Sequence, residues 1–138
     1  MEPRISLITL GVADLATTRR FYLDGLGWEP EVDVADEVVM IRVGERLLLS
    51  LWDLEAFAAE VGDVRRGPGV VPITLAHNVA TAPEVDEVLA TARRAGADSV
   101  GAAAWRDWGG YSGYFADPDG YRWEIAYNPG PIADLVLG

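Results

Sequence analysis

The sequence predicts an α+β fold: two βαβββ modules in one chain, whose mixed sheets curl around a shared cleft. Three observations support this. Two apolar halves repeat the same order of strand-like and helix-like segments, and a polar Gly- and Pro-rich stretch separates them. Asp-Pro-Asp-Gly at 117–120 marks a tight turn before the last strand. We therefore expect a first module at 1–62, a linker at 63–70 and a second module at 71–138, forming one compact domain.

The first module is expected to contain a strand, a helix and three further strands. A helix is predicted at 15–26. It begins after Asp14, because the Asp14 carboxylate can accept hydrogen bonds from the first free amides of a helix. Asp53 precedes a second, shorter helix at 54–61 for the same reason. The strands of this module are predicted at 5–12, 29–34, 38–43 and 46–52.

The second module repeats this order. Its helix, at 82–95, begins with the capping box of Thr81 and Glu84, continues with apolar residues at helical spacing and ends at Gly96. The strands of this module are predicted at 71–79, 99–103, 111–116 and 122–127.

Strand alternation separates the two faces of each sheet. In the first strand, Ile8, Leu10 and Val12 are expected to face the helices. His77, the chain's single histidine, lies on the corresponding row of the second module, so we expect a partly buried core histidine. The residues expected on the opposite faces, around the cleft, are Leu7, Thr9, Gly11, Leu48, Ser50, Trp52, Thr74, Ala76, Asn78, Glu124, Ala126 and Asn128.

Composition excludes several classes of protein. The chain has no cysteine, so disulfide scaffolds, thiolate nucleophiles and cysteine metal sites are excluded. Its 11 basic residues stand against 22 acidic ones, a net charge of −11 that disfavours a nucleic-acid partner. No apolar run reaches the ~20 residues that span a bilayer, so no membrane partner is expected. These features predict a cytoplasmic protein whose partner is a small molecule.

Three segments together resemble the vicinal oxygen chelate superfamily, the glyoxalase, bleomycin-resistance and extradiol dioxygenase group. They are residues 10–15 with Phe21-Tyr22, the Gly-Leu-Gly-Trp run at 25–28, and the turn at 117–120 followed by Glu124. The resemblance covers nearly the whole chain and implies the two-module fold and a homodimer. It does not imply one function, because the group includes isomerases, dioxygenases, fosfomycin-inactivating transferases and antibiotic-sequestering proteins.

The resemblance also implies where a metal would bind. In metal-dependent members, four ligands project into the cleft, two from each module. The corresponding positions here are Leu7, Leu48 or Ser50, Thr74, and Glu124, and only the last is a usual metal ligand. We therefore expect no metal and no cofactor, as in the metal-free members of the group.

Aromatic residues near these positions suggest a ligand. Trp and Tyr offer flat stacking surfaces for planar compounds and cations. The leading hypothesis is a small-molecule-binding protein that sequesters a planar or cationic compound in an aromatic-lined cleft. The expected ligand-binding residues are Thr9, Ser50, Trp52, Thr74, Asn78, Trp105, Trp108, Tyr111 and Glu124.

Two alternatives stay open. The first is an enzyme, a lyase or isomerase or a dioxygenase-like protein, with Glu124 as its base or with an unrecognised metal site. Glu124 is the one candidate catalytic residue. The second alternative is a regulatory binding module with no link to antibiotics.

Overall fold

The computed structural model describes residues 1–65 and 67–137 of the chain. They form two compact units, Met1–Pro68 and Gly69–Gly138, and the first ends within the predicted linker at 63–70. Arg66 in that linker and Gly138 at the end of the second module lie outside the described residues. Each unit combines helices with a mixed sheet, so the predicted α+β class is confirmed.

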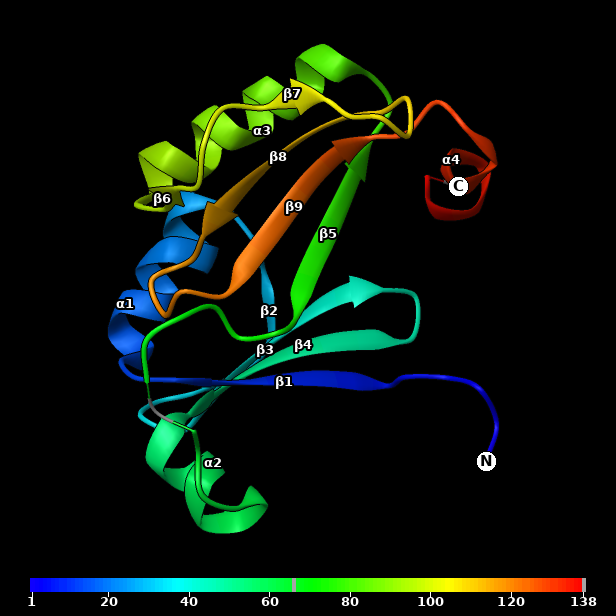
Figure 1. Cartoon of the computed structure of the whole chain (residues 1–138). Coiled ribbons are helices and arrows are strands. Elements are labelled where there is room, and N and C mark those ends of the chain that lie inside the picture. Colours follow the sequence, from blue (N-terminus) through cyan, green and yellow to red (C-terminus); the bar gives the residue numbers. More distant parts are fainter. Residues whose placement is uncertain (66, 138) are drawn as a thin grey trace. The chain divides into compact units, whose positions relative to one another are not determined.

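The first unit has the βαβββ order followed by a helix (Figure 1). Its sheet has the strand order β1-β4-β3-β2, in which β1 runs parallel to β4 and the other neighbours are antiparallel. Its elements are β1 (Leu7–Val12), α1 (Leu15–Arg19), η1 (Arg20–Gly25), β2 (Pro30–Val34), β3 (Val38–Gly44), β4 (Leu47–Asp53) and α2 (Leu54–Val61).

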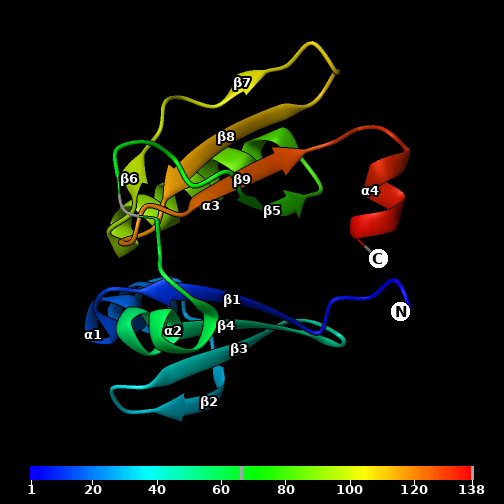
Figure 2. The same cartoon turned by 60° about the horizontal axis from the view of Figure 1, so that its bottom comes forward.

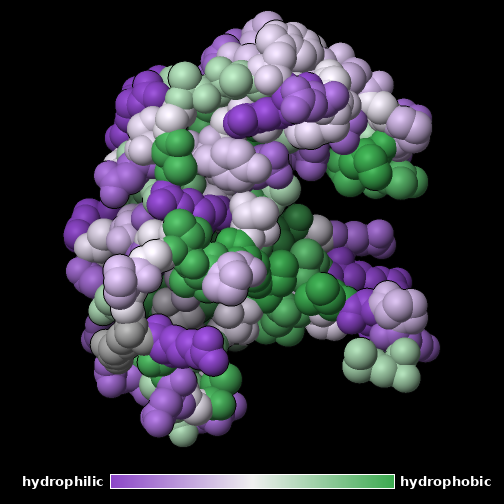
Figure 3. Space-filling view, viewed as in Figure 1, coloured by the Kyte–Doolittle hydropathy of each residue, from purple (hydrophilic) through white to green (hydrophobic). Residues whose placement is uncertain are grey.

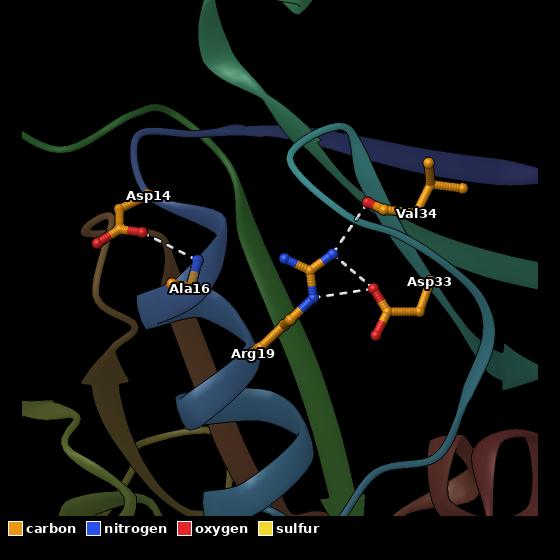
Figure 4. Close-up of polar contacts among 5 residues, drawn as sticks. All are labelled: Asp14, Ala16, Arg19, Asp33 and Val34. Atoms are coloured by element: carbon orange, nitrogen blue, oxygen red, sulfur yellow. Dashed lines mark hydrogen bonds and ion pairs between the residues drawn. The ribbon is translucent and has the colours of Figure 1, made fainter.

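The helical segment predicted at 15–26 consists of an α-helical turn and a wider π-helical turn. Asp14 caps α1, because its Oδ1 accepts a hydrogen bond from the Ala16 amide at 2.9 Å (Figure 4). In η1 the Leu26 amide bonds the Phe21 carbonyl, five residues earlier, at 2.9 Å. Phe21 is almost fully buried, so the segment anchors the apolar core of this unit.

An ion pair ties α1 to the edge strand β2. Arg19 Nε donates to Asp33 Oδ1 at 2.8 Å, and Arg19 Nη2 donates to the Val34 carbonyl at 2.9 Å (Figure 4). Because both charged side chains are partly exposed, we expect this pair to contribute about 0–1 kcal/mol.

The first unit's sheet carries helices on both faces, contrary to the expectation of a helix-free face. Figure 1 shows α1 and α2 on opposite sides of β1. A Cβ atom on Gly11 would lie 2.7 Å from Leu54 Cδ1, so α2 packs directly on the row that contains Gly11 and Trp52. The row was expected to line the cleft, and α2 covers its end because Asp53 starts a helix directly after β4.

The second unit also follows the βαβββ order, with additions. Its sheet has the order β5-β9-β8-β6, and β7 pairs with β8 at the edge (Figure 2). Its elements are β5 (Thr74–Val79), α3 (Ala82–Ala95), β6 (Asp98–Ser99), β7 (Ala104–Trp105), β8 (Tyr111–Ala116), β9 (Arg122–Tyr127) and α4 (Pro131–Val136).

Apart from strand ends, two secondary-structure elements of the second unit differ from the sequence prediction. The strand predicted at 99–103 is wrong: Gly101 has a φ of 117°, which breaks the extended chain into β6 and β7. The helix α4 was not predicted, because it is short and follows a Pro- and Gly-containing stretch that usually indicates a loop. Its visible surface is largely apolar (Figure 3). Leu135 of this helix is 79% exposed.

His77 lies on the predicted face of β5 but is not buried. It pairs with Ile125 of β9, on the face that α3 covers, and its side chain is exposed. The expected partial burial is therefore wrong. The reason is that β5 is an edge strand, while α3 packs mainly over β8 and β9.

Candidate functional site

The turn between β8 and β9 fixes the position of Glu124. Asp117 is 2% exposed, and its Oδ1 accepts hydrogen bonds from the amides of Asp119 and Tyr121 at 3.0 and 2.9 Å. Gly120 adopts a φ of 87°, which a residue with a side chain rarely adopts. The register of the hairpin then follows from the turn, and Glu124 lies directly opposite Tyr114.

Tyr114 holds the Glu124 carboxylate. Its hydroxyl donates a hydrogen bond to Glu124 Oε1 at 2.8 Å. Burial raises the pKa of Tyr114 above its usual 10.0, and the hydrogen bond and negative charge of Glu124 raise it further. Tyr114 therefore stays protonated at neutral pH and acts as a donor to the carboxylate.

Arg106 lies on the same face of the sheet. Its Nε donates to Ser112 Oγ at 3.0 Å, and its Nη2 donates to the Ser112 carbonyl at 3.0 Å. These two bonds orient the guanidinium, whose central carbon lies 6.0 Å from the centre of the Tyr114 ring. The positive charge of Arg106 partly opposes the rise in the pKa of Tyr114.

Trp108 projects from the loop between β7 and β8, and its ring lies on Gly110. A Cβ atom at Gly110 would lie 1.6 Å from Trp108 Cζ3, so only glycine leaves room for the indole. Two backbone hydrogen bonds between Arg106 and the glycines at 109 and 110 close the loop. Trp108 itself is 52% exposed, which leaves much of its indole accessible to a ligand.

Glu124 and Trp108 line a common depression of about 370 Å³ on the second unit. Across residues 1–65 and 67–137, Tyr114 is the one side chain that donates a hydrogen bond to Glu124, and no cation forms an ion pair with it. A carboxylate oxygen, Oε2, is therefore available to a ligand. The residues that line the depression are Ala76, Asn78, Trp108, Glu124, Ala126, Asn128 and Ile132.

The structure separates the sequence-predicted residues of the second unit into two groups. Thr74, Asn78 and Glu124 share one face, because β5 and β9 pair in parallel register. Trp105 and Tyr111 lie on the opposite face: the Tyr111 hydroxyl donates to an Asp86 carboxylate oxygen on α3 at 3.1 Å. The Trp105 ring lies 5.4 Å from that of Tyr111, so these two aromatic residues do not gather around Glu124.

The sequence-predicted residues of the first unit share one face of its own sheet. Thr9 pairs with Ser50, and Trp52 follows two residues later on the same row. Ser50 is buried, and the Trp52 ring meets the Phe57 ring of α2 edge to face at 6.0 Å. In the described structure, Trp52 therefore packs against α2.

The sequence prediction missed Tyr114 and Arg106. Tyr114 could have been found from the hairpin register alone, because a turn at 117–120 places it opposite Glu124. Arg106 could not, since its position depends on the irregular loop that follows β7.

A divalent metal does not fit the positions that the fold family uses. In the first unit, Leu7 and its neighbour Leu48 offer no donor atom, and Ser50 offers only a hydroxyl. In the second unit, Thr74 offers a hydroxyl and Glu124 a carboxylate. Within the described parts of the chain, no group of three or more His, Cys, Asp or Glu side chains could hold a metal ion.

A family model described as the Glyoxalase/Bleomycin resistance protein/Dioxygenase superfamily matches residues 4–125. The chain belongs to this superfamily. The resemblance inferred from the sequence is thereby confirmed, and with it the vicinal oxygen chelate fold. Members of this superfamily bind small molecules.

Solved structures agree with this family assignment. A glyoxalase-related enzyme from Fulvimarina pelagi is 35% identical, with a TM-score of 0.83 over 92% of this chain and 89% of that one. Two further structures are each 23% identical and show the fold alone. A glyoxalase/bleomycin resistance protein/dioxygenase from Nocardioides has a TM-score of 0.76, covering 94% of this chain and 89% of its own. A lactoylglutathione lyase from Agrobacterium tumefaciens has a TM-score of 0.67, covering 91% and 94%.

Among curated proteins, the comparison found no match. Over residues 1–65 and 67–137, no helix has both the length and the apolar character needed to cross a membrane.

Proposed function

We propose that this superfamily member is a small-molecule-binding protein that sequesters a compound with a planar, cationic group at the Glu124 depression. One observation supports the proposal above the others. Glu124 is held by Tyr114, lines the depression together with an accessible Trp108, and has no described cation as its partner. The net charge of −11 would also attract a cation over a longer range.

The chemistry of the depression suits such a compound. A cation on the ligand would pair with the Glu124 carboxylate, and a charge-assisted hydrogen bond is stronger than a neutral one. The face of the Trp108 indole would stabilise the same charge and stack on an aromatic ring. Ala76 and Ala126 leave the floor of the depression flat and apolar. The side-chain amides of Asn78 and Asn128 would orient polar groups of the ligand.

The other predicted contacts are part of the proposal. Thr74 lies on the face of Glu124 and extends the candidate surface along β5. Ligand contacts by Thr9, Ser50 and Trp52, or by Trp105 and Tyr111, stay predictions, as do a homodimer and a cytoplasmic location. Size-exclusion chromatography with light scattering would test the homodimer.

Titration with a planar aromatic cation, such as acridine orange, tests the proposal. We expect saturable quenching of tryptophan fluorescence, and a roughly 10-fold weaker affinity after Glu124→Gln because a charged contact is lost. Glu60→Gln, at an exposed glutamate of α2, is the matched control and should bind like the wild type. Equal affinities for the wild type and Glu124→Gln would contradict the proposal.

The hydrogen-bonded pair of Tyr114 and Glu124 also favours a second candidate, an enzyme with Glu124 as general base. Turnover of a hemithioacetal or a catechol that disappears in Glu124→Gln would favour this candidate. Elemental analysis of the purified protein would test for an unrecognised metal site. Near-stoichiometric metal would indicate a metal site whose donor atoms lie outside the family's usual positions.

A further inference from the structure

A second depression, of about 430 Å³, lies on the second unit and has a different chemistry. Its wall consists of Val70, Val71, Ile73 and Val100, which are between 42% and 56% exposed. Arg122 and Tyr114 also line it, and Arg122 is the one charged residue among the lining residues. An apolar wall of this size next to a single cation is typical of a binding site for a small molecule.

Arg122 is available to a ligand. It precedes Glu124 by two residues on β9, so both side chains project from the same face, yet they form no ion pair. In the described portion of the chain, the Arg122 guanidinium donates no hydrogen bond to another side chain or to a carbonyl. The backbone of Arg122 is fixed, because Thr74 Oγ1 donates to its carbonyl at 3.2 Å and β5 and β8 pair on either side.

The two depressions are distinct. The first contains Glu124 and suits a cation, whereas the second contains Arg122 and suits an anion. Tyr114 connects them, since it lines the second depression while its hydroxyl holds Glu124. Because the Tyr114 hydroxyl donates its hydrogen bond to Glu124 and the Thr74 hydroxyl donates to the Arg122 carbonyl, the Arg122 guanidinium is left as the principal polar group toward the second depression.

We propose that the second depression binds an apolar monocarboxylate, with the carboxylate on Arg122 and the hydrocarbon body on the valine and isoleucine wall. A guanidinium presents two parallel donors that match the two oxygens of a carboxylate. The wall supplies apolar area that the ligand would remove from water. This site goes beyond the proposed function, because it takes a ligand of opposite charge. Among the residues that the structure describes, it shares no lining residue with the Glu124 depression, and Thr74 is the one predicted cation contact, besides Glu124's partner Tyr114, that lies along it.

The probe is 2-naphthoate, and the matched neutral ligand is 2-naphthamide. We expect calorimetry at neutral pH and about 0.15 M salt to show tighter binding of naphthoate than of naphthamide. Arg122→Gln should weaken naphthoate binding about 10-fold or more, and Arg122→Lys less, because it keeps the charge but loses the paired donors. Arg46→Gln, at an exposed arginine of the first unit, is the control and should change the affinity less than about twofold.

Three results would overturn the proposal: equal binding of naphthoate and naphthamide, unchanged naphthoate affinity in Arg122→Gln, or concentration-dependent self-association through the wall that Ile73→Asp abolishes and naphthoate does not affect. If Arg122→Gln unfolds, the affinities of the wild type for naphthoate and naphthamide still test whether the site prefers a carboxylate. Glu124→Gln separates this site from the first, because it should leave naphthoate affinity unchanged or slightly increased.

Discussion

The two units share one topology and differ in what they place on the equivalent strand pair. In the first unit, β4 presents Leu48, Ser50 and Trp52 along one row, next to β1. In the second unit, β9 presents Arg122, Glu124 and Ala126 at the corresponding register positions, next to β5. The first row is apolar or neutral and the second carries two charges of opposite sign.

The difference extends to the packing on each row. The bulky Trp52 meets Phe57, and α2 covers that end of the first unit's sheet. The small Ala126 instead forms part of a depression next to Trp108. The comparison suggests that the same backbone serves stability in the first unit and ligand chemistry in the second. Substitutions of Gly11, Gly110 and Tyr114 test this division, and their effects should decrease in that order.

Gly11→Val should destabilise the first unit most. The new side chain would overlap Leu54 Cδ1, which lies 2.7 Å from an ideal Cβ, so the Leu54 side chain or α2 itself would have to move. Overpacking of this kind costs about 1–3 kcal/mol, measurable as a lower midpoint of urea unfolding.

Asn78→Val is the matched control for that change, because Asn78 is the register equivalent of Gly11 in the second unit. It faces an open depression, so its effect on the free energy of unfolding should be within about 0.5 kcal/mol. Similar losses in both variants would contradict the division between the units.

Much of the fold could be predicted from the sequence, because capping and turn residues act locally. The bounds of α2, α3, β8 and β9 agree with the prediction. The exposure of His77 could not be predicted, since it depends on how far α3 reaches across the sheet. The position of Glu124 followed from its turn, but the depression beside it depends on a loop that brings Trp108 there and on α4.

Gly110→Ala should weaken binding of the planar cation, and it should lower the free energy of unfolding less than Gly11→Val does. The added methyl group would occupy the position of the Trp108 indole, 1.6 Å from Cζ3, and would displace the ring from the depression. We expect a roughly 10-fold loss of affinity, close to that of Trp108→Ala, from the lost cation–π and stacking contacts. Gly67→Ala, where an added Cβ meets no atom within 4 Å, is the control. Unchanged affinity in Gly110→Ala would show that Trp108 is not part of the binding site.

Tyr114→Phe should have the smallest effect. At neutral pH it should lower the free energy of unfolding by about 1 kcal/mol, because one hydrogen bond is lost. Burial and Glu124 raise the pKa of Tyr114 in the folded protein above 10.0, so the folded state binds the phenolic proton more tightly than the unfolded chain does. The contribution of the Tyr114 proton to the free energy of unfolding is complete below pH 10.0 and is lost as the pH rises through the folded-state pKa.

The alkaline loss of stability should therefore be shallower in Tyr114→Phe than in the wild type, as measured by urea unfolding between neutral and alkaline pH. Tyr111→Phe is a useful comparison, because burial and Asp86 also raise the pKa of Tyr111, on the opposite face. Tyr114→Phe should reduce cation affinity severalfold and Tyr111→Phe should not. Equal effects of the two variants on affinity would argue against a role for Tyr114 in holding Glu124.

Mapping amide chemical shifts by NMR during titration with a planar aromatic cation would show which unit binds the ligand. If the Glu124 depression binds the cation, the largest, saturable shifts should occur at Trp108, Glu124, Ala126 and Asn128, and Glu124→Gln should remove them. Saturable shifts confined to Thr9, Ser50 and Trp52, unaffected by Glu124→Gln, would contradict the proposal by assigning ligand binding to the first unit.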